Sequence, residues 1–108
     1  MILIADSGST KVHWLLMTAN GQSSDFRTDG INPVFQSPED IRRIVSDQLL
    51  PQLGKYMWIG PITNIYFYGA GCTPEKKVVV KEVLESLFRH ATAEVESDML
   101  GAARGVLG

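Results

Sequence analysis

The feature that most constrains the fold is the start of the chain, where an apolar run ends in a polar, glycine-containing turn. Residues 1–5 are all apolar, and Asp6-Ser7-Gly8-Ser9-Thr10-Lys11 follows at once. A short apolar run bounded by turn residues predicts a buried central strand. Residues 12–18 form a second strand candidate, so the turn leads back into the sheet. This excludes a Walker loop and a dinucleotide-binding fingerprint, because both lead into a helix.

Three further strands are expected. An Asn-Gly pair at residues 20–21 is a hairpin signal, so a polar edge strand should cover residues 23–28. Residues 64–68 and 91–97 have the composition of later strands. The last strand carries two glutamates on one side, which would be costly in a sheet covered on both faces. It is therefore also expected at an edge.

Helix signals alternate with the later strands. Ser37 is a candidate cap for a first helix that Pro51 and Gly54 should close, and Thr73 is a candidate cap for a second. A last helix, rich in small residues, is expected over residues 98–107. The order β-β-β-α-β-α-β-α predicts an α/β domain with a mixed five-stranded sheet and helices on its faces.

Composition narrows the function classes. The chain of 108 residues is long enough for one domain, and 44% hydrophobic with 20% charged residues is typical of a soluble protein. A net charge of -2 argues against nucleic-acid binding. No apolar run approaches the roughly 18 residues of a membrane span, so a cytoplasmic protein without a membrane partner is expected. Cys72 is the only cysteine, which excludes an internal disulfide.

The turn at residues 6–11 is a candidate phosphate site. A chain that turns sharply after a strand can expose several backbone N–H groups together, and these bind phosphate oxygens. Gly8 permits close approach, while Ser9 and Thr10 add hydroxyl donors. Asp6 could hold Mg²⁺ through water, and Lys11 could supply a counter-charge. On the motif alone, an ordinary hairpin turn with one glycine is an equally good interpretation.

An Asp-x-Gly-x-Thr-Lys turn at the head of this order of elements resembles the actin-like ATPase superfamily. Within it, the chain looks most like the group of N-acetylglucosamine kinases and BadF/BadG-type ATPases. The resemblance implies a ribonuclease-H-like fold with ATP and Mg²⁺ bound in a cleft between two lobes. Residues 1–108 would be the amino-terminal lobe, with the second lobe absent from this sequence. The complete protein could form a homodimer.

The resemblance also suggests residues for the sugar side. Asp98 resembles the strand-end aspartate that accepts the proton of the attacking hydroxyl in this family, although it could be a plain helix cap. Asn32 resembles an asparagine that contacts sugar hydroxyls, although Asn-Pro also commonly marks a turn. Gly69, Ala70 and Gly71 resemble the strand end whose bare backbone lines the sugar pocket, or they form a simple strand-to-helix turn.

Four other residues are conspicuous, but a structural role is expected for each. His13 lies inside a strand and is interpreted as a packed or edge residue. Cys72 is interpreted as a small, partly buried residue, because nothing nearby in the sequence would lower its pKa. Trp14 and Trp58 are interpreted as packing residues.

The leading functional hypothesis is phosphoryl transfer from ATP to the 6-hydroxyl of N-acetylglucosamine or a related amino sugar. The isolated chain is not expected to turn over ATP, because the second lobe is required. The alternative implied by the same resemblance is an ATPase that activates a partner redox enzyme, which a single cysteine weakens. A third hypothesis is a non-catalytic nucleotide-binding module.

Overall fold

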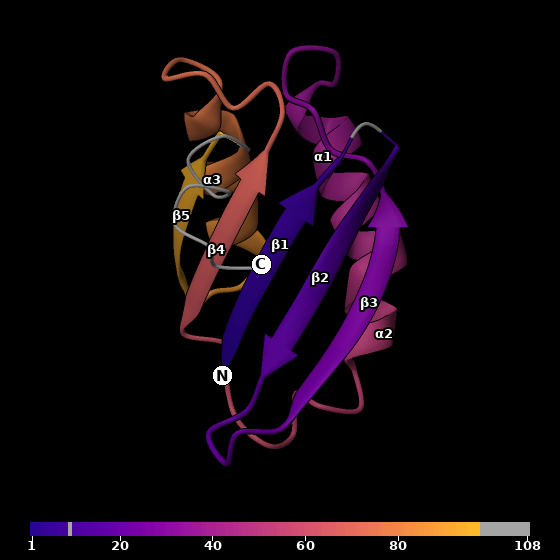
Figure 1. Cartoon of the computed structure of the whole chain (residues 1–108), viewed down its shortest axis with the longest axis vertical. Helices are drawn as coiled ribbons and strands as arrows, with labels where there is room; N and C mark the ends of the chain where they lie inside the picture. Colours follow the sequence, from indigo (N-terminus) through magenta and orange to yellow (C-terminus); the bar gives the residue numbers. More distant parts are fainter. Residues whose placement is uncertain (9, 98–108) are drawn as a thin grey trace.

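A mixed sheet is the centre of the molecule (Figure 1). The computed structural model describes residues 1–8 and 10–97. The sheet has five strands in the order β3-β2-β1-β4-β5, with β1–β2 and β2–β3 antiparallel and β1–β4 and β4–β5 parallel. The predicted mixed five-stranded sheet is therefore confirmed. The strands are β1 Ile2–Ser7, β2 Lys11–Met17, β3 Ser23–Asp29, β4 Asn64–Gly69 and β5 Thr92–Glu96.

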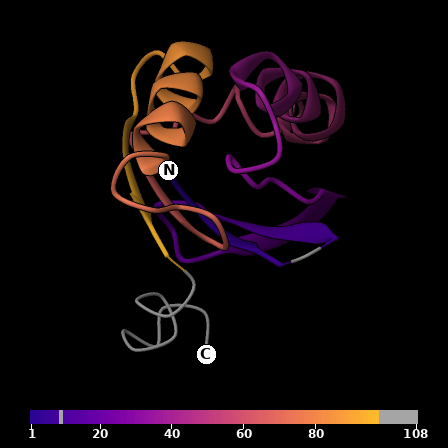
Figure 2. The same cartoon turned by 90° about the horizontal axis from the view of Figure 1, so that it is seen from above.

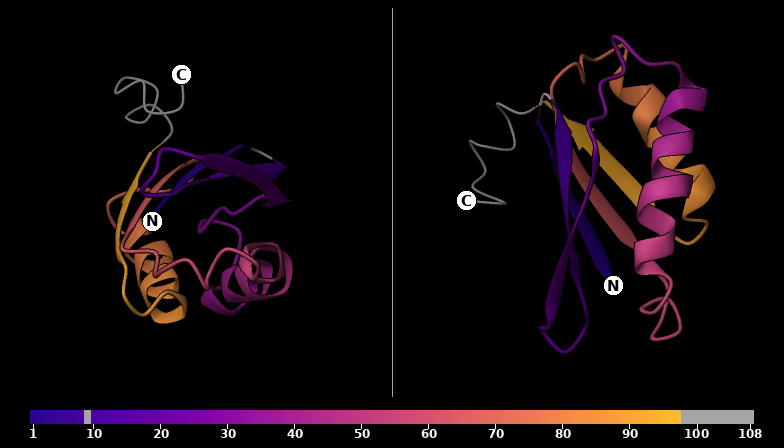
Figure 3. Two further views of the ribbon diagram at one scale, coloured as in Figure 1. Left: turned by 90° about the horizontal axis from the view of Figure 1, so that it is seen from below. Right: turned by 90° about the vertical axis from the view of Figure 1, so that its right-hand side faces the viewer.

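The described helices all cover the same face of the sheet (Figures 2 and 3). Helix α1 (Pro38–Ile44), the π-helical segment η1 (Val45–Leu49) and helix α2 (Leu50–Leu53) form one continuous helical stretch. Helix α3 (Lys77–Leu87) joins β4 to β5. None of the described helices is long and apolar enough to cross a membrane. The helix predicted for residues 98–107 lies outside the described residues.

The core lies between the sheet and this helical layer. Successive side chains of a strand point to opposite faces, so every second residue of β1 and β2 meets the helices. Trp14 is fully buried there, as predicted, with its ring centroid 5.9 Å from that of Phe67. Its indole N–H donates to the hydroxyl of Thr28 at 3.0 Å, so this buried polar atom has a partner.

Strand β1 is longer than the apolar run that predicts it. Asp6 pairs with His13 and Ser7 with Val12, so the strand ends at Ser7 and the turn begins at Gly8. The alternation of faces explains why two polar residues can extend a buried strand. Asp6 is exposed on the face that the described helices leave open, whereas Ser7 is buried under them with its hydroxyl bonded to backbone.

The predicted helix boundaries are partly wrong. Ser37 caps α1 in a capping box with Asp40, as predicted. Pro51, expected to end the helix, instead lies inside this continuous stretch, directly after the π-helical segment, and the stretch runs on to Leu53 with Gly54 as its C-cap. The hydrogen bonding has already departed from the α pattern there, since the Leu50 amide bonds the Val45 carbonyl.

Thr73 caps the turn that leads into α3, because its hydroxyl accepts the Lys76 amide at 3.3 Å and its carbonyl accepts the amides of Lys76 and Lys77. The regular helix begins only at Lys77, later than predicted.

The two edge strands are those expected, β3 on one side and β5 on the other. The outer edge of β5 is partly covered by helix α3. The Ala93 amide donates to the carboxylate of Glu85 at 2.9 Å, and the Lys81 ammonium donates to the Ala93 carbonyl at 2.9 Å. These side chains occupy backbone groups that would otherwise be open to another strand.

The prediction that Trp58 is a packing residue is wrong, because this residue is 82% exposed. It lies in the loop between α2 and β4. Tyr56 takes the aromatic packing position in this loop, with its ring 5.7 Å from that of Phe26 in an edge-to-face contact. Tyr56 is partly buried against the core, so it and not Trp58 is the aromatic residue of this loop that packs.

Candidate functional site

The predicted site residues that the structure describes gather at the carboxyl ends of the parallel strands. Strands β1, β3, β4 and β5 run in the same direction, so the segments that follow them lie at the same end of the molecule (Figure 1). Those segments are the β1–β2 hairpin turn, the β3–α1 loop at residues 30–37 and the β4–α3 loop at residues 70–76. Ligands of α/β proteins commonly bind outside the carboxyl ends of such strands.

The hairpin turn has an exposed acid and an exposed hydroxyl. Asp6 and Thr10 are both exposed, and Ser9 lies outside the described residues. The Gly8 amide donates to the Lys11 carbonyl at 2.9 Å, so it closes the hairpin. Because its amide is already bonded, Gly8 could only allow a phosphate to approach closely, since it has no side chain. Other donors of the turn would have to supply the hydrogen bonds to phosphate.

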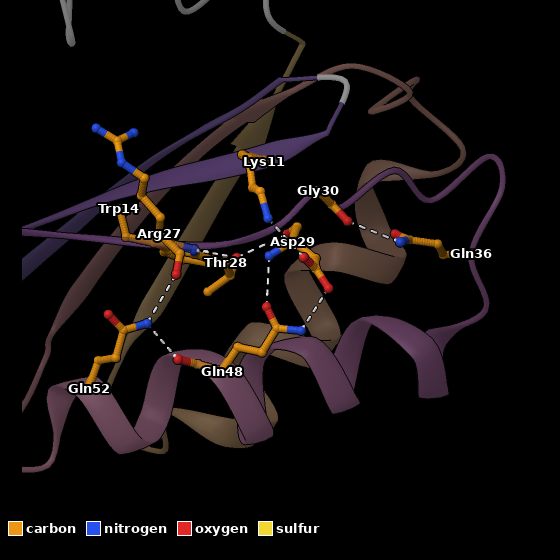
Figure 4. Close-up of polar contacts among 9 residues, drawn as sticks. All are labelled: Lys11, Trp14, Arg27, Thr28, Asp29, Gly30, Gln36, Gln48 and Gln52. Carbon is orange, nitrogen blue, oxygen red and sulfur yellow. Dashed lines mark hydrogen bonds and ion pairs between the residues drawn. The ribbon is translucent and has the colours of Figure 1, made fainter.

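Lys11 is engaged in a polar network with β3 and the helical stretch (Figure 4). Its ammonium lies 3.2 Å from Oδ1 of Asp29, and Gln48 donates to Oδ2 of the same carboxylate at 2.9 Å. The Gln48 hydrogen bond and then the Lys11 pair hold the pKa of Asp29 below its ordinary value of 3.8. The charge that Lys11 could offer a phosphate is thus partly compensated by Asp29.

The side chain of Gln36 holds the β3–α1 loop through two hydrogen bonds to its backbone. The Gln36 side-chain nitrogen donates to the Gly30 carbonyl at 3.0 Å, as Figure 4 shows. The carbonyl oxygen of the same side chain accepts the Asn32 amide at 2.7 Å. Asn32 itself accepts the Val34 amide on Oδ1 at 2.9 Å. The turn role considered for Asn32 is therefore present. Its Nδ2 is the part of the carboxamide that can donate to a ligand.

Asn32 lies directly against the β4–α3 loop. A Cβ on Gly71 would collide with the carboxamide oxygen of Asn32, and Gly71 has a φ of +80°. Gly69 is also closely packed, because a Cβ there would lie 2.9 Å from the Cβ of Ser7. The structure thus brings together Asn32 and Gly71, which the sequence placed on the sugar side from segments almost forty positions apart.

A cavity of about 270 Å³ opens beside Gly71 at the ends of β4 and β5. It contains one ion pair, between the Lys77 ammonium and a Glu96 carboxylate oxygen at 3.6 Å. Asp98, the predicted base, lies outside the described residues. The residues that line the cavity are Gly71, Cys72, Thr73, Pro74, Lys77, Glu96 and Ser97.

His13 and Cys72 have structural positions compatible with those expected of them, and Ala70 belongs to the strand end predicted to line the sugar pocket. His13 Nε2 lies 3.2 Å from Oδ2 of Asp25 on the neighbouring strand, where both side chains are largely exposed. Cys72 is buried, at 4% exposure. Ala70 is half-buried between the two glycines.

Asp6 fits the limited protein ligation that Mg²⁺ uses beside phosphate. Among residues 1–8 and 10–97, no group of three or more His, Cys, Asp or Glu side chains could hold a metal ion. Mg²⁺ keeps several waters and commonly takes only one or two carboxylates plus phosphate oxygens. One exposed carboxylate next to the turn therefore suits a nucleotide-borne magnesium ion and does not suit a permanent metal centre.

Two residues that hold the site in place, Ser7 and Gln36, are not predicted from the sequence. Ser7 is fully buried and bonds the backbone of Ile31, and Gln36 holds the loop that contains Asn32. A signal for Ser7 was present, since a serine that continues an apolar strand on its buried side needs a hydrogen-bond partner. No sequence pattern identifies Gln36, because its partners depend on how the loop folds.

The chain matches no protein-family model, and no curated protein matches it. Among solved structures it is similar to a protein from Porphyromonas gingivalis named "putative N-acetylglucosamine kinase", with 44% sequence identity and a TM-score of 0.87. The match covers 96% of this chain and 36% of that protein, so this chain spans about a third of it, the amino-terminal part. The predicted resemblance to N-acetylglucosamine kinases and the kinase-like α/β fold are thereby confirmed.

Proposed function

We propose that this chain is the amino-terminal lobe of an ATP-dependent kinase that phosphorylates N-acetylglucosamine, or a related amino sugar, on its 6-hydroxyl. The observation that carries the proposal is the packing of Asn32 against Gly71, at the sheet edge where the Asp6–Thr10 turn also lies. Phosphate and sugar must meet for transfer, and this edge has a candidate surface for each. The similarity to the kinase-named protein from P. gingivalis supports the same assignment.

Each residue has a role that its chemistry allows. Asp6 would hold Mg²⁺ through water, and the magnesium ion would neutralise charge on the phosphates of ATP. The exposed hydroxyl of Thr10 would donate to a phosphate oxygen. Asp98 would orient the sugar hydroxyl and accept its proton as the new bond to phosphorus forms.

The sugar would be held by groups of the two loops. Asn32 would donate to a sugar hydroxyl through Nδ2, while its Oδ1 accepts the Val34 amide. The absence of a side chain on Gly71 lets the Asn32 carboxamide lie against this loop, so Asn32 and the backbone of residues 69–71 would line the sugar pocket together. Catalysis would come mainly from positioning and from charge stabilisation, and a second lobe would have to close over the nucleotide.

The test uses the complete gene product that contains this chain. A coupled ATPase assay across amino sugars should show turnover with N-acetylglucosamine or a close relative. Asp98→Asn should lower kcat by about 10²- to 10⁴-fold, the usual contribution of a general base, with nucleotide affinity nearly unchanged. Activity that survived this substitution would remove Asp98 from the base role. Absence of sugar-dependent turnover in the unaltered protein would contradict the kinase assignment itself.

A further inference from the structure

Ser7 is a buried polar residue in the middle of the candidate site. Its side chain is 0% exposed, on the helix-covered face of the last position of β1. The hydroxyl donates to the Ile31 carbonyl at 2.8 Å, and it accepts from the Ile31 amide at 3.2 Å. One side chain therefore satisfies both backbone groups of Ile31, and burial makes each of these bonds costly to lose.

These bonds connect the two halves of the proposed site. Ser7 is directly followed by Gly8 of the hairpin turn, and Ile31 is directly followed by Asn32 of the β3–α1 loop. The Gly30 amide adds a further tie, donating to the Thr10 carbonyl at 2.9 Å. Phosphate turn and sugar loop are thus joined through the backbone at residues 30–31.

The surroundings of Ser7 also limit how the loop can move. Ile31 is 1% exposed, so its side chain anchors the same residue in the core. On the other side, Ser7 lies so close to Gly69 that a Cβ on that glycine would be 2.9 Å from the Ser7 Cβ. Asn32 then lies against Gly71, where its carboxamide occupies the space that a Cβ would take.

We propose that Ser7 is a positioning residue that sets Asn32 relative to the phosphate turn, through its paired hydrogen bonds to Ile31. The part of this inference that concerns sugar binding rests on the proposed function. Ser7 touches neither sugar nor phosphate, because it is buried beneath the loop. Its loss should therefore affect sugar binding more than nucleotide binding, since Asn32 contacts the sugar in the proposed function.

The experiment compares Ser7→Ala with the unaltered complete gene product. The variant should raise KM for the amino sugar about tenfold and leave KM for ATP within about twofold. Hydrogen exchange of peptides that cover residues 30–36 should become faster by about tenfold or more, because the Ile31 amide loses its buried acceptor. Ser7→Cys should give intermediate values, since a thiol is a weak donor and a weak acceptor.

Thr28→Ala is the matched control. Thr28 is 3% exposed, lies in the same row of the sheet as Ser7, and has hydrogen bonds with the Trp14 indole and the Asp29 carbonyl. It should lower the melting temperature as Ser7→Ala does, without the change in sugar KM or in exchange at residues 30–36. If the two alanine variants behave alike, Ser7 is only a stabilising residue and the inference is overturned.

The remaining outcomes are also decisive. Should Ser7→Ala fail to fold, Ser7→Cys takes its place, and unaltered exchange and KM in that variant would overturn the inference. Should the unaltered protein turn over no amino sugar, the proposed function fails. The exchange comparison between Ser7→Ala and Thr28→Ala would then still decide whether Ser7 fixes the loop.

Discussion

Glycine has two different roles among the residues with positive φ. Gly21, at φ +87°, has nothing within 4 Å of where a Cβ would be, whereas Gly71, at φ +80°, faces the Asn32 carboxamide. A side chain in this left-handed region costs about 1–2 kcal/mol by itself. The cost of the backbone conformation is similar at the two positions. The difference in unfolding free energy lost on substitution should therefore measure the contact between Gly71 and Asn32.

Gly71→Ala is expected to destabilise the chain more than Gly21→Ala does. The Gly21 variant should lose about 1–2 kcal/mol of unfolding free energy, and the Gly71 variant about 1–3 kcal/mol more, because the new methyl group displaces Asn32. Urea denaturation of both variants measures this. Adding Asn32→Ala to Gly71→Ala should recover part of the extra loss. Equal losses in the two single variants would show that Asn32 moves aside without cost.

At the scale of elements, the edge of β5 depends on a pair of charges from α3. The Lys81 ammonium lies 2.7 Å from Oε2 of Glu85, and both side chains bond the backbone of Ala93. The Lys81 hydrogen bond, followed by that from the Ala93 amide, keeps the pKa of Glu85 below its ordinary value of 4.5. The folded state therefore prefers the ionised carboxylate, and protonation should loosen the contact between α3 and β5.

Glu85→Gln is expected to flatten the dependence of stability on pH in acid. A carboxylate whose pKa is lowered by folding stabilises the fold above its unfolded value of 4.5, and this stabilisation disappears as pH falls through the lower folded value. Stability measured from pH 7 downward should thus decline less steeply in the variant, while Asp29 leaves a residual slope of the same sign. Glu82→Gln, an exposed change of one charge on the same helix, is the control. A slope equal to that of the unaltered chain would contradict the role given to Glu85.

At the scale of the whole molecule, the sheet was largely predictable and the contacts between its loops were not. Apolar runs, alternation of apolar and polar residues, and turn residues locate five strands, because the burial of a strand is visible in its own local sequence. Asn32 and Gly71 meet only through the folding of segments that are distant in sequence, and the partners of Ser7 and Gln36 share this dependence. Trp58 shows the opposite failure, since hydrophobicity alone indicated burial where Tyr56 already fills the position.

Folding and catalysis are expected to have different requirements in the isolated 108-residue chain. Its sheet and helical layer share one buried cluster, which includes Leu3, Trp14 and Phe67, so we expect a cooperative urea transition. ATP turnover is not expected of the isolated chain, because Asp6 and Thr10 lie exposed on its surface. Phosphoryl transfer needs fixed donors around the phosphates and protection from water, which an exposed turn cannot supply.

We therefore expect the 108-residue chain to fold and yet to give no sugar-dependent ATP turnover above background. The coupled assay on the purified chain, with the complete gene product as the positive control, measures this directly. Circular dichroism through the urea transition separates an inactive folded lobe from an unfolded one. Sugar phosphorylation by the lobe alone would mean that its own residues complete the active site, and the requirement for a second lobe would then be wrong.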